Sequence, residues 1–169
     1  MRRAKMNAWV YKVNSRHFAA AGGWHFDRYF GSSRRGPYGM GGRRWIRSPQ
    51  SWAHIRRIRR SDLFLCYQSD ERKIYGLARS AGPGYESLQD SGVFDSVDFA
   101  PGGLRFAVPI PVAHGGTRDV FRNISAFTVP SRGTIHPVRP DELRAIVAIA
   151  ARWNPTQRKA IRRFIAQSE

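Results

Sequence analysis

The sequence is poor in cysteine, in long apolar runs and in acidic residues, and each shortage excludes a class of protein. It holds one cysteine, Cys66, which excludes an internal disulfide framework and a cysteine-rich zinc site. Because Cys66 lies in an apolar run, a small core side chain is favoured over a reactive thiol. No apolar run approaches the roughly 20 residues that a membrane-spanning helix needs. No apolar segment follows the basic N-terminus, so we expect a soluble, cytoplasmic protein.

The shortage of acidic residues leaves a strong positive charge. The chain has 29 Lys and Arg against 12 Asp and Glu, a formal net charge of +17. A field of this sign attracts polyanions. Most of the basic residues are arginines, which bind phosphate with paired hydrogen bonds and stack on bases. Nucleic acid is therefore the expected partner, with an anionic membrane surface as the second candidate. A GC-rich genome would also raise the arginine content.

The centre of the sequence predicts a β-hairpin. Residues 63–67 and 74–78 are apolar runs rich in aromatic and branched side chains, and the polar residues 68–73 between them suit a reversal of the chain. Apolar side chains fall on both faces, so both strands should be buried. Gly76 in the second run predicts a bulge or the close approach of another backbone.

The rest of the 169 residues predicts one domain built around this hairpin. Further strands are expected at residues 8–13, 104–112, 124–129 and 134–138, and the prolines in the second of these indicate an edge strand. Helices are expected to begin at Ser48–Pro49, Pro140 and Asn154, the last being a basic helix over about 154–167. In the first helix, Ile55 and Ile58 should face the core. A long Gly- and aromatic-rich loop at about 14–44 and an acidic excursion or lid at 82–101 complete the chain.

Four segments resemble, in the same order, the EVE domain and its relative the YTH domain. They are Ala-Trp-Val-Tyr-Lys at 8–12, the helix-to-strand segment 55–69, Lys-Ile-Tyr-Gly-Leu-Ala at 73–78, and residues 135–143 before a helix. Ser61 stands where the family has the glycine of a Gly-Asp-Leu turn. After Lys12 the chain departs from the EVE pattern, and Asn14 is similar to YTH domains instead. The resemblance implies an α+β fold, a small PUA-like (EVE/YTH-like) β-barrel flanked by helices.

The resemblance also implies a function. These families bind a single nucleotide, often a modified one such as a methylated base, that is flipped into an aromatic cage. The extruded base regains stacking worth about 1–3 kcal/mol on aromatic faces, and a few polar groups read its edge. We therefore expect a non-catalytic reader of modified DNA or RNA that needs no cofactor.

Particular residues follow from this resemblance. Trp45 aligns with the cage tryptophan that precedes the helix. Ser48, Asn14 and Lys12 are polar candidates, whose alternatives are a helix cap, a turn residue and a surface lysine. Tyr67 is expected in the pocket floor or in the core. The motifs do not assign the second wall, for which Trp24, Phe26, Phe94 and Phe99 are candidates. The candidate base-binding set is Trp45, Ser48, Asn14, Lys12, Tyr67, Trp24, Phe94 and Phe99.

A set of arginines is expected to follow the phosphate backbone, with a merely solvated basic face as the alternative. The candidate phosphate-binding residues are Arg47, Arg56, Arg57, Arg60, Arg158 and Arg162.

Two other functions remain open at this stage. Asp62, Glu71 and Lys73 loosely match the PD-(D/E)xK nuclease core, in which two carboxylates hold Mg²⁺. Against this, Glu71 falls in the predicted turn. The five histidines show no metal-ligand spacing. The third possibility is an RNA- or ribosome-associated basic protein without base selectivity.

Overall fold

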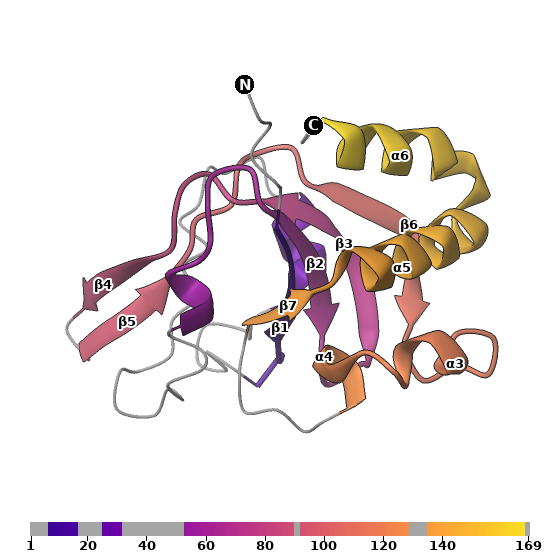
Figure 1. Cartoon of the computed structure of the whole chain (residues 1–169), viewed down its shortest axis with the longest axis horizontal. Helices are drawn as coiled ribbons and strands as arrows, with labels where there is room; N and C mark the ends of the chain where they lie inside the picture. Colours follow the sequence, from indigo (N-terminus) through magenta and orange to yellow (C-terminus); the bar gives the residue numbers. More distant parts are fainter. Residues whose placement is uncertain (1–6, 17–24, 32–52, 90–91, 129–134, 168–169) are drawn as a thin grey trace.

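The computed structural model describes residues 7–16, 25–31, 53–89, 92–128 and 135–167, and the statements below refer to these residues. Their centre is a five-stranded sheet in the order β6-β3-β2-β1-β7, in which β1 and β2 run parallel and the other pairs are antiparallel (Figure 1). Its strands are β1 (Ala8–Val13), β2 (Leu63–Gln68), β3 (Lys73–Arg79), β6 (Leu104–Pro111) and β7 (Ile135–Val138). The strands β4 (Tyr85–Gln89) and β5 (Gly92–Ser96) form a separate hairpin that projects from one side of the sheet (Figure 1).

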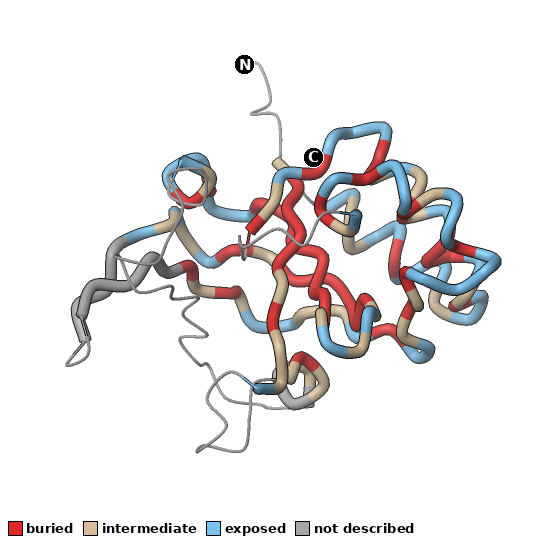
Figure 2. Tube along the Cα trace, turned by 90° about the horizontal axis from the view of Figure 1, so that it is seen from below, coloured by how far each residue is buried: buried red, intermediate tan, exposed pale blue. Residues whose placement is uncertain are grey.

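Helices cover one face of the sheet. They are α3 (Arg118–Phe121), α4 (Ser125–Thr128), α5 (Pro140–Trp153), the 3-10 turn η2 (Pro155–Gln157) and α6 (Arg158–Ala166). Alternation along β1 places Ala8 and Val10 on this face, where they share a core with Ile146 of α5 and Ile161 of α6. The buried positions run through the centre of the molecule, as Figure 2 shows. No helix among the described residues is long and apolar enough to cross a membrane.

The opposite face of the sheet carries a second core that is rich in aromatic rings. Trp9 and Tyr11 of β1 pack there with Phe64 of β2. Short segments cover this face, namely α1 (Phe26–Gly31) and the turn of helix at residues 53–55 with the residues after it. Two cores on two faces explain why the strands of the central hairpin are apolar on both sides.

The predicted hairpin is confirmed as β2 and β3. The pairing register of β3 with β6 shifts between Ile74 and Gly76, which confirms the predicted irregularity. A Cβ atom at position 76 would overlap the carbonyl oxygen of Leu104 and lie 2.8 Å from the Phe30 ring. Glycine is therefore required because another backbone passes at this point.

The sheet corrects one part of the expected architecture. Within the described residues, β6 and β7 form two open edges, so the strands make an open sheet rather than a closed barrel. The edge position of β6 was predicted from Pro109 and Pro111, which cannot donate to a neighbouring strand, and it is confirmed.

The strand predicted at residues 124–129 is wrong, because α4 (Ser125–Thr128) occupies this segment. Hydrogen bonds from Ile124 N to Phe121 O at 3.1 Å and from Phe127 N to Ile124 O at 2.9 Å close tight turns. Phe121, Ile124 and Phe127 thus recur at three-residue steps on the core side. This helical spacing outweighs the β-propensity of the segment.

The other expected elements keep their places with changed limits. Residues 48–52 lie outside the described residues, but Ile55 and Ile58 are buried while Arg56 and Arg57 are exposed, as the helical pattern predicted. Pro140 begins α5 as expected. Asn154 ends α5, and the last helix begins only at Arg158, after η2. The acidic excursion contains the β4–β5 hairpin.

Candidate functional site

The parallel pairing of β1 with β2 brings the carboxyl ends of both strands to one edge of the sheet. Lys12 lies opposite Tyr67 and Val13 lies opposite Gln68 in the register. Ligands of open α/β sheets bind at such carboxyl ends. We call this edge, with Lys12, Asn14 and the turn 68–73, the carboxyl-end site.

The turn 68–73 anchors the chain that leaves β1. The hydroxyl of Ser15 donates to Oδ2 of Asp70. The N–H of Phe26 donates to Oε1 of Gln68 at 3.2 Å, and Nε2 of Gln68 donates to Oδ1 of Asp70 at 2.9 Å. Two points on either side of residues 17–24 are therefore tied to one turn of the central hairpin.

A second anchor in the same turn is Glu71. Nε2 of His25 and the hydroxyl of Tyr75 bond its two carboxylate oxygens, and the His25 and Tyr75 rings meet edge to face at 4.9 Å. Burial raises the pKa of Glu71, but the hydrogen bonds from Tyr75 and His25 outweigh it and hold that pKa below its ordinary value. Glu71 thus remains an anionic support for the segment before α1.

Two predicted polar residues lie at the carboxyl-end site. Asn14 is half-buried, and its Oδ1 accepts from the N–H of Arg16 at 2.9 Å, which is the turn role considered as its alternative. Lys12 is half-buried, and burial lowers its pKa to about 8. The ammonium of Lys12 is therefore partly stripped of water.

Several predicted aromatic residues turn out to fill the core. Tyr67 is 6% exposed and meets Phe127 edge to face at 5.1 Å. Phe99 is 5% exposed and packs on Phe64 at 5.1 Å and on Tyr11 at 5.4 Å. Phe26 is also fully buried. None of these three predicted rings offers an open face to a stacked base in this structure.

The remaining base-binding candidates cannot be placed. Trp24, Trp45 and Ser48 lie outside the described residues, and so does the phosphate candidate Arg47. Phe94 lies in β5 opposite Ser87, but its side chain is not described.

A cavity that the sequence did not reveal lies beside the carboxyl-end site. It has a volume of about 370 Å³ and lies between the turn of the central hairpin, the end of β6 and helices α3 and α4. Its lining residues are Arg72, Val112, Ala113, Arg118, Phe121, Arg122, Phe127 and Thr128. The sequence offered one indication of this cavity, the i, i+4 spacing of Arg118 and Arg122. No local sequence pattern, however, places these two arginines near Arg72.

A group of exposed arginines lies toward the opposite end of β2. Arg56, Arg57 and Arg60 are exposed in the segment before this strand, and Arg158 and Arg162 are exposed on α6. Arg57 also lies over the Trp9 ring at 6.0 Å.

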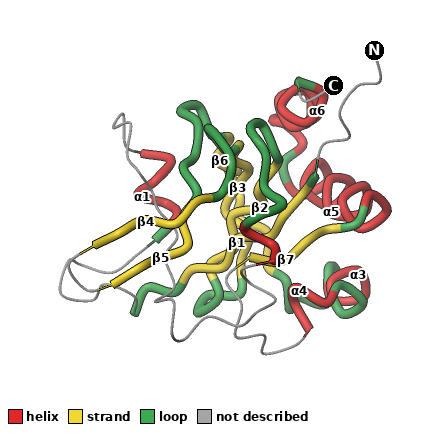
Figure 3. Tube along the Cα trace, turned by 60° about the vertical axis from the view of Figure 1, so that its left-hand side comes forward, coloured by secondary structure: helices red, strands yellow, loops and turns green. Residues whose placement is uncertain are grey.

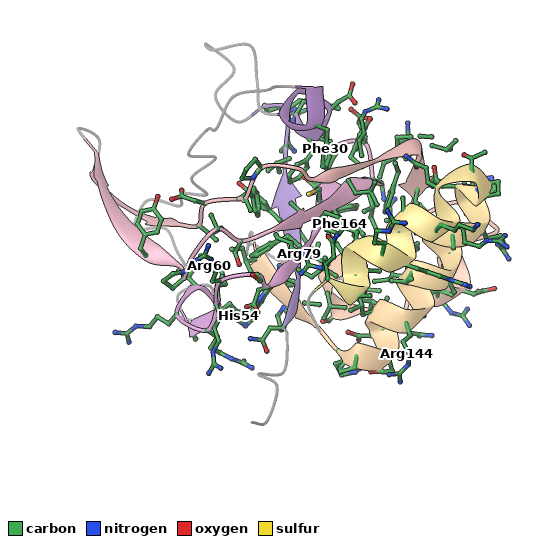
Figure 4. All side chains as sticks on the ribbon, turned by 90° about the horizontal axis from the view of Figure 1, so that it is seen from above. Phe30, His54, Arg60, Arg79, Arg144 and Phe164 are labelled. Carbon is green, nitrogen blue, oxygen red and sulfur yellow. The ribbon has the colours of Figure 1, made fainter. Side chains whose placement is uncertain are left out.

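Arg79 of β3 joins these two basic segments. Its Nη1 donates to Ser61 O at 2.8 Å, and its Nη2 donates to Phe164 O at the end of α6. Its guanidinium lies over the Phe164 ring at 5.0 Å (Figure 4). The segment before β2 and the end of α6, far apart in sequence, therefore lie next to each other, and we call the exposed arginines of the two segments the basic surface.

Asp62 has a structural role. It is 3% exposed and accepts hydrogen bonds from Trp9 Nε1 at 2.9 Å, Arg59 N at 2.9 Å and Asn7 N at 3.1 Å. The preceding Ser61 has a φ of 68°, a left-handed conformation that glycine adopts more readily than serine.

The nuclease arrangement considered above is wrong. Asp62 precedes β2 and Glu71 follows it, and a six-residue strand at 3.2–3.4 Å per residue separates them by about 20 Å. One Mg²⁺ cannot bind both carboxylates at that separation. Among the described residues no three His, Cys, Asp or Glu side chains form a group that could hold a metal ion.

Comparison with known proteins gives matches in structure alone. No family model matches the sequence, and a search of curated proteins found no match. Protein Rpa0253 from Rhodopseudomonas palustris superposes with a TM-score of 0.63 at 19% identity, covering 86% of this chain and 94% of that one. Human THYN1, solved in complex with 5-methylcytosine-containing DNA, gives a TM-score of 0.61 at 16% identity, covering 85% and 97%.

The DUF55 domain of human thymocyte nuclear protein 1 gives a TM-score of 0.55 at 16% identity, covering 85% of this chain and 98% of that domain. These matches extend over nearly the whole length of the compared chains. Identities this low show the fold and nothing further. The protein has the α+β fold of the DUF55 domain of human thymocyte nuclear protein 1, which is the EVE-like fold that the sequence predicted.

Proposed function

We propose that this protein is a non-catalytic nucleic-acid-binding domain that recognises a modified nucleobase, such as a methylated one, flipped out of its strand. The observation that carries the proposal is the fold shared with human THYN1, whose structure holds 5-methylcytosine-containing DNA. The net charge of +17 supports a polyanionic partner.

The base would bind at the carboxyl-end site. Lys12 and Asn14 lie there, and the segment that leaves this edge carries Trp45 and Ser48. Trp45 would supply one aromatic wall, while Asn14 and Ser48 would read the base edge. Since Phe99 and Tyr67 fill the core, Trp24 and Phe94 are the remaining candidates for the second wall.

The phosphate backbone would lie on the basic surface at the other end of β2. Arg56, Arg57 and Arg60 lie in the segment before β2, and Arg158 and Arg162 lie on α6, which Arg79 links to that segment. Each phosphate that such residues neutralise releases counterions, so the observed affinity should fall steeply with salt.

The test is binding to short DNA and RNA oligonucleotides with and without 5-methylcytosine, 5-hydroxymethylcytosine or N6-methyladenine. Fluorescence anisotropy at fixed salt, with Mg²⁺ in a parallel series, measures both affinity and cleavage. We expect at least a tenfold preference for one modified strand and no cleavage. Equal, salt-sensitive binding to every strand would leave a basic RNA- or ribosome-associated protein, and Mg²⁺-dependent cleavage would overturn the proposal.

Two variants separate the base from the backbone. Trp45→Ala should abolish the preference for the modified base while the circular dichroism spectrum stays unchanged. Arg57→Ala should instead weaken binding to all strands alike and reduce the slope of log K against log salt by about 0.9 for DNA. A changed base preference in Arg57→Ala would remove Arg57 from the phosphate-binding surface.

A further inference from the structure

We infer that the cavity between the turn of the central hairpin and helices α3 and α4 is a second ligand site, which binds one nucleotide through its phosphate. It lies on the helix-covered face, beside the carboxyl-end site and at the opposite end of β2 from the basic surface. Figure 3 shows α3 and α4 next to each other at one end of this face, with α6 at the other end. The inference rests on the proposed function only if the nucleotide belongs to a bound strand.

The charge of the cavity favours a phosphate. Arg72 reaches it from the hairpin turn, and Arg118 and Arg122 reach it from α3 and its end. No lining residue carries a carboxylate. Arg122 does pair with Asp119 at 3.3 Å, but that pair is exposed, with 81% of the Asp119 side chain open to water. Exposed pairs of this kind bind weakly, so a phosphate can compete for Arg122.

Arg72 is held in position although its backbone conformation is an unfavourable one. Its φ of 55° lies in the left-handed region, which side chains other than glycine rarely adopt. Its carbonyl oxygen accepts from the N–H of Val112 at 2.9 Å, and its guanidinium hydrogen-bonds to the Tyr67 side chain. Arg72 is therefore fixed beside the cavity by both its backbone and its side chain.

The aromatic part of the lining favours a nucleotide over a bare phosphate. Phe127 is half-buried and lines the cavity. Edge-to-face contacts with Tyr67 at 5.1 Å and with Phe121 at 5.0 Å hold its ring. The volume of about 370 Å³ falls within the 300–1,000 Å³ of small-molecule sites. Guanidinium groups and a fixed ring in one cavity match the two halves of a nucleotide.

Because the cavity lies next to Lys12, its nucleotide can come from a bound strand as well as from free solution. Tyr67 lies opposite Lys12 in the parallel pair and contacts Phe127 in the cavity lining. A strand whose flipped base occupies the carboxyl-end site could therefore place a neighbouring nucleotide in the cavity. A free mononucleotide would use the same groups.

The test is calorimetric titration of the whole protein with cytidine monophosphate, cytidine and inorganic phosphate. We expect the monophosphate to bind at least tenfold more tightly than either of the other two. If cytidine binds as tightly as the monophosphate, the phosphate plays no part in binding. If inorganic phosphate binds as tightly as the monophosphate, the Phe127 ring plays no part.

A pair of variants ties this binding to the cavity. The double variant Arg118→Ala, Arg122→Ala changes exposed side chains, so the fold should persist, and it should weaken the monophosphate at least tenfold. Arg144→Ala removes an exposed arginine of α5 outside the cavity lining and should leave the affinity unchanged. Equal affinities of the double variant and the wild type would overturn the inference.

Oligonucleotide binding by the same variants distinguishes the two sources. If the double variant weakens all strands but keeps their order of preference, the cavity binds a nucleotide of the strand. If the double variant binds strands normally but no longer binds the monophosphate, the ligand of the cavity is a free nucleotide. A protein that lacks any modified-base preference but still binds the monophosphate in the cavity would overturn the proposed function and leave this inference standing.

Discussion

The side-chain amide of Asn154 pairs with both backbone groups of Val108 at the edge of the sheet. Val108 N–H donates to Oδ1 of Asn154 at 2.7 Å, and Nδ2 of Asn154 donates to Val108 O at 3.1 Å. Gln157 forms the same kind of bonds with Ala107 N and Arg105 O. Two amides thus satisfy backbone groups of residues 105–108, in the stretch of β6 where the pairing with β3 is interrupted.

Asn154→Ala should destabilise the protein by about 1–3 kcal/mol, because it leaves backbone groups of β6 without partners at a position that is 1% exposed. Urea unfolding followed by circular dichroism measures the change. The matched control is Asn123→Ala at an exposed position, which should change stability by less than about 0.5 kcal/mol. Equal stability of the two variants would show that the amide of Asn154 does not support the edge.

Gly76→Ala should destabilise the protein by about 1–3 kcal/mol, because the added methyl group meets the backbone of Leu104 in the adjacent strand. The control is Gly82→Ala, where a Cβ atom has nothing within 4 Å, and its effect should stay within about 0.5 kcal/mol. Thermal unfolding of both variants measures the difference. A stable Gly76→Ala protein would mean that β6 can move away from β3.

Asp62→Asn should destabilise the protein by about 1.5–3 kcal/mol. The carboxylate accepts from Trp9, Arg59 and Asn7, and an amide group would turn a donor toward these donors. Asp119→Asn, at an exposed position, serves as the control and should be near neutral. Chemical unfolding measures both variants. An Asp62→Asn protein with the stability of the wild type would contradict the structural role of Asp62.

The buried position of Lys12 should give the stability a particular pH dependence. Burial lowers its pKa from 10.5 to about 8, so the folded protein loses this proton near pH 8 while the unfolded chain keeps it to about pH 10.5. The unfolded state binds more protons in this window, so the contribution of Lys12 to stability rises with pH between these values.

The measurement is urea unfolding of the wild type and of Lys12→Met from pH 7.5 to 9.5. The stability difference between the two proteins should shift in favour of the wild type as the pH rises. A difference that is constant over this range would show that Lys12 keeps an ordinary pKa in the folded state. If the ammonium binds nucleic acid, the affinity of the wild type should fall as the pH passes about 8.

The sequence by itself determined the local elements and much of their placement. Uninterrupted apolar runs in the central hairpin require burial on two faces, and two core clusters provide it. Gly76 marked the close approach of β6, and the prolines of β6 marked an edge. Ile55 and Ile58 recur at helical spacing and face the core. These patterns are read within a few residues, so no long-range contact is needed to interpret them.

Only the tertiary structure decided which groups meet. Tyr67 and Phe99 are aromatic residues of the kind that line a base-binding cage, yet packing on the two faces of the sheet buries them. Asp62 and Glu71 lie nine positions apart in sequence but at opposite ends of a strand. The cavity joins Arg72 to Arg118 and Arg122 because the hairpin turn folds against the end of β6. Periodicity and composition report the local conformation of a chain, whereas a site depends on distances that close only when separate segments pack together.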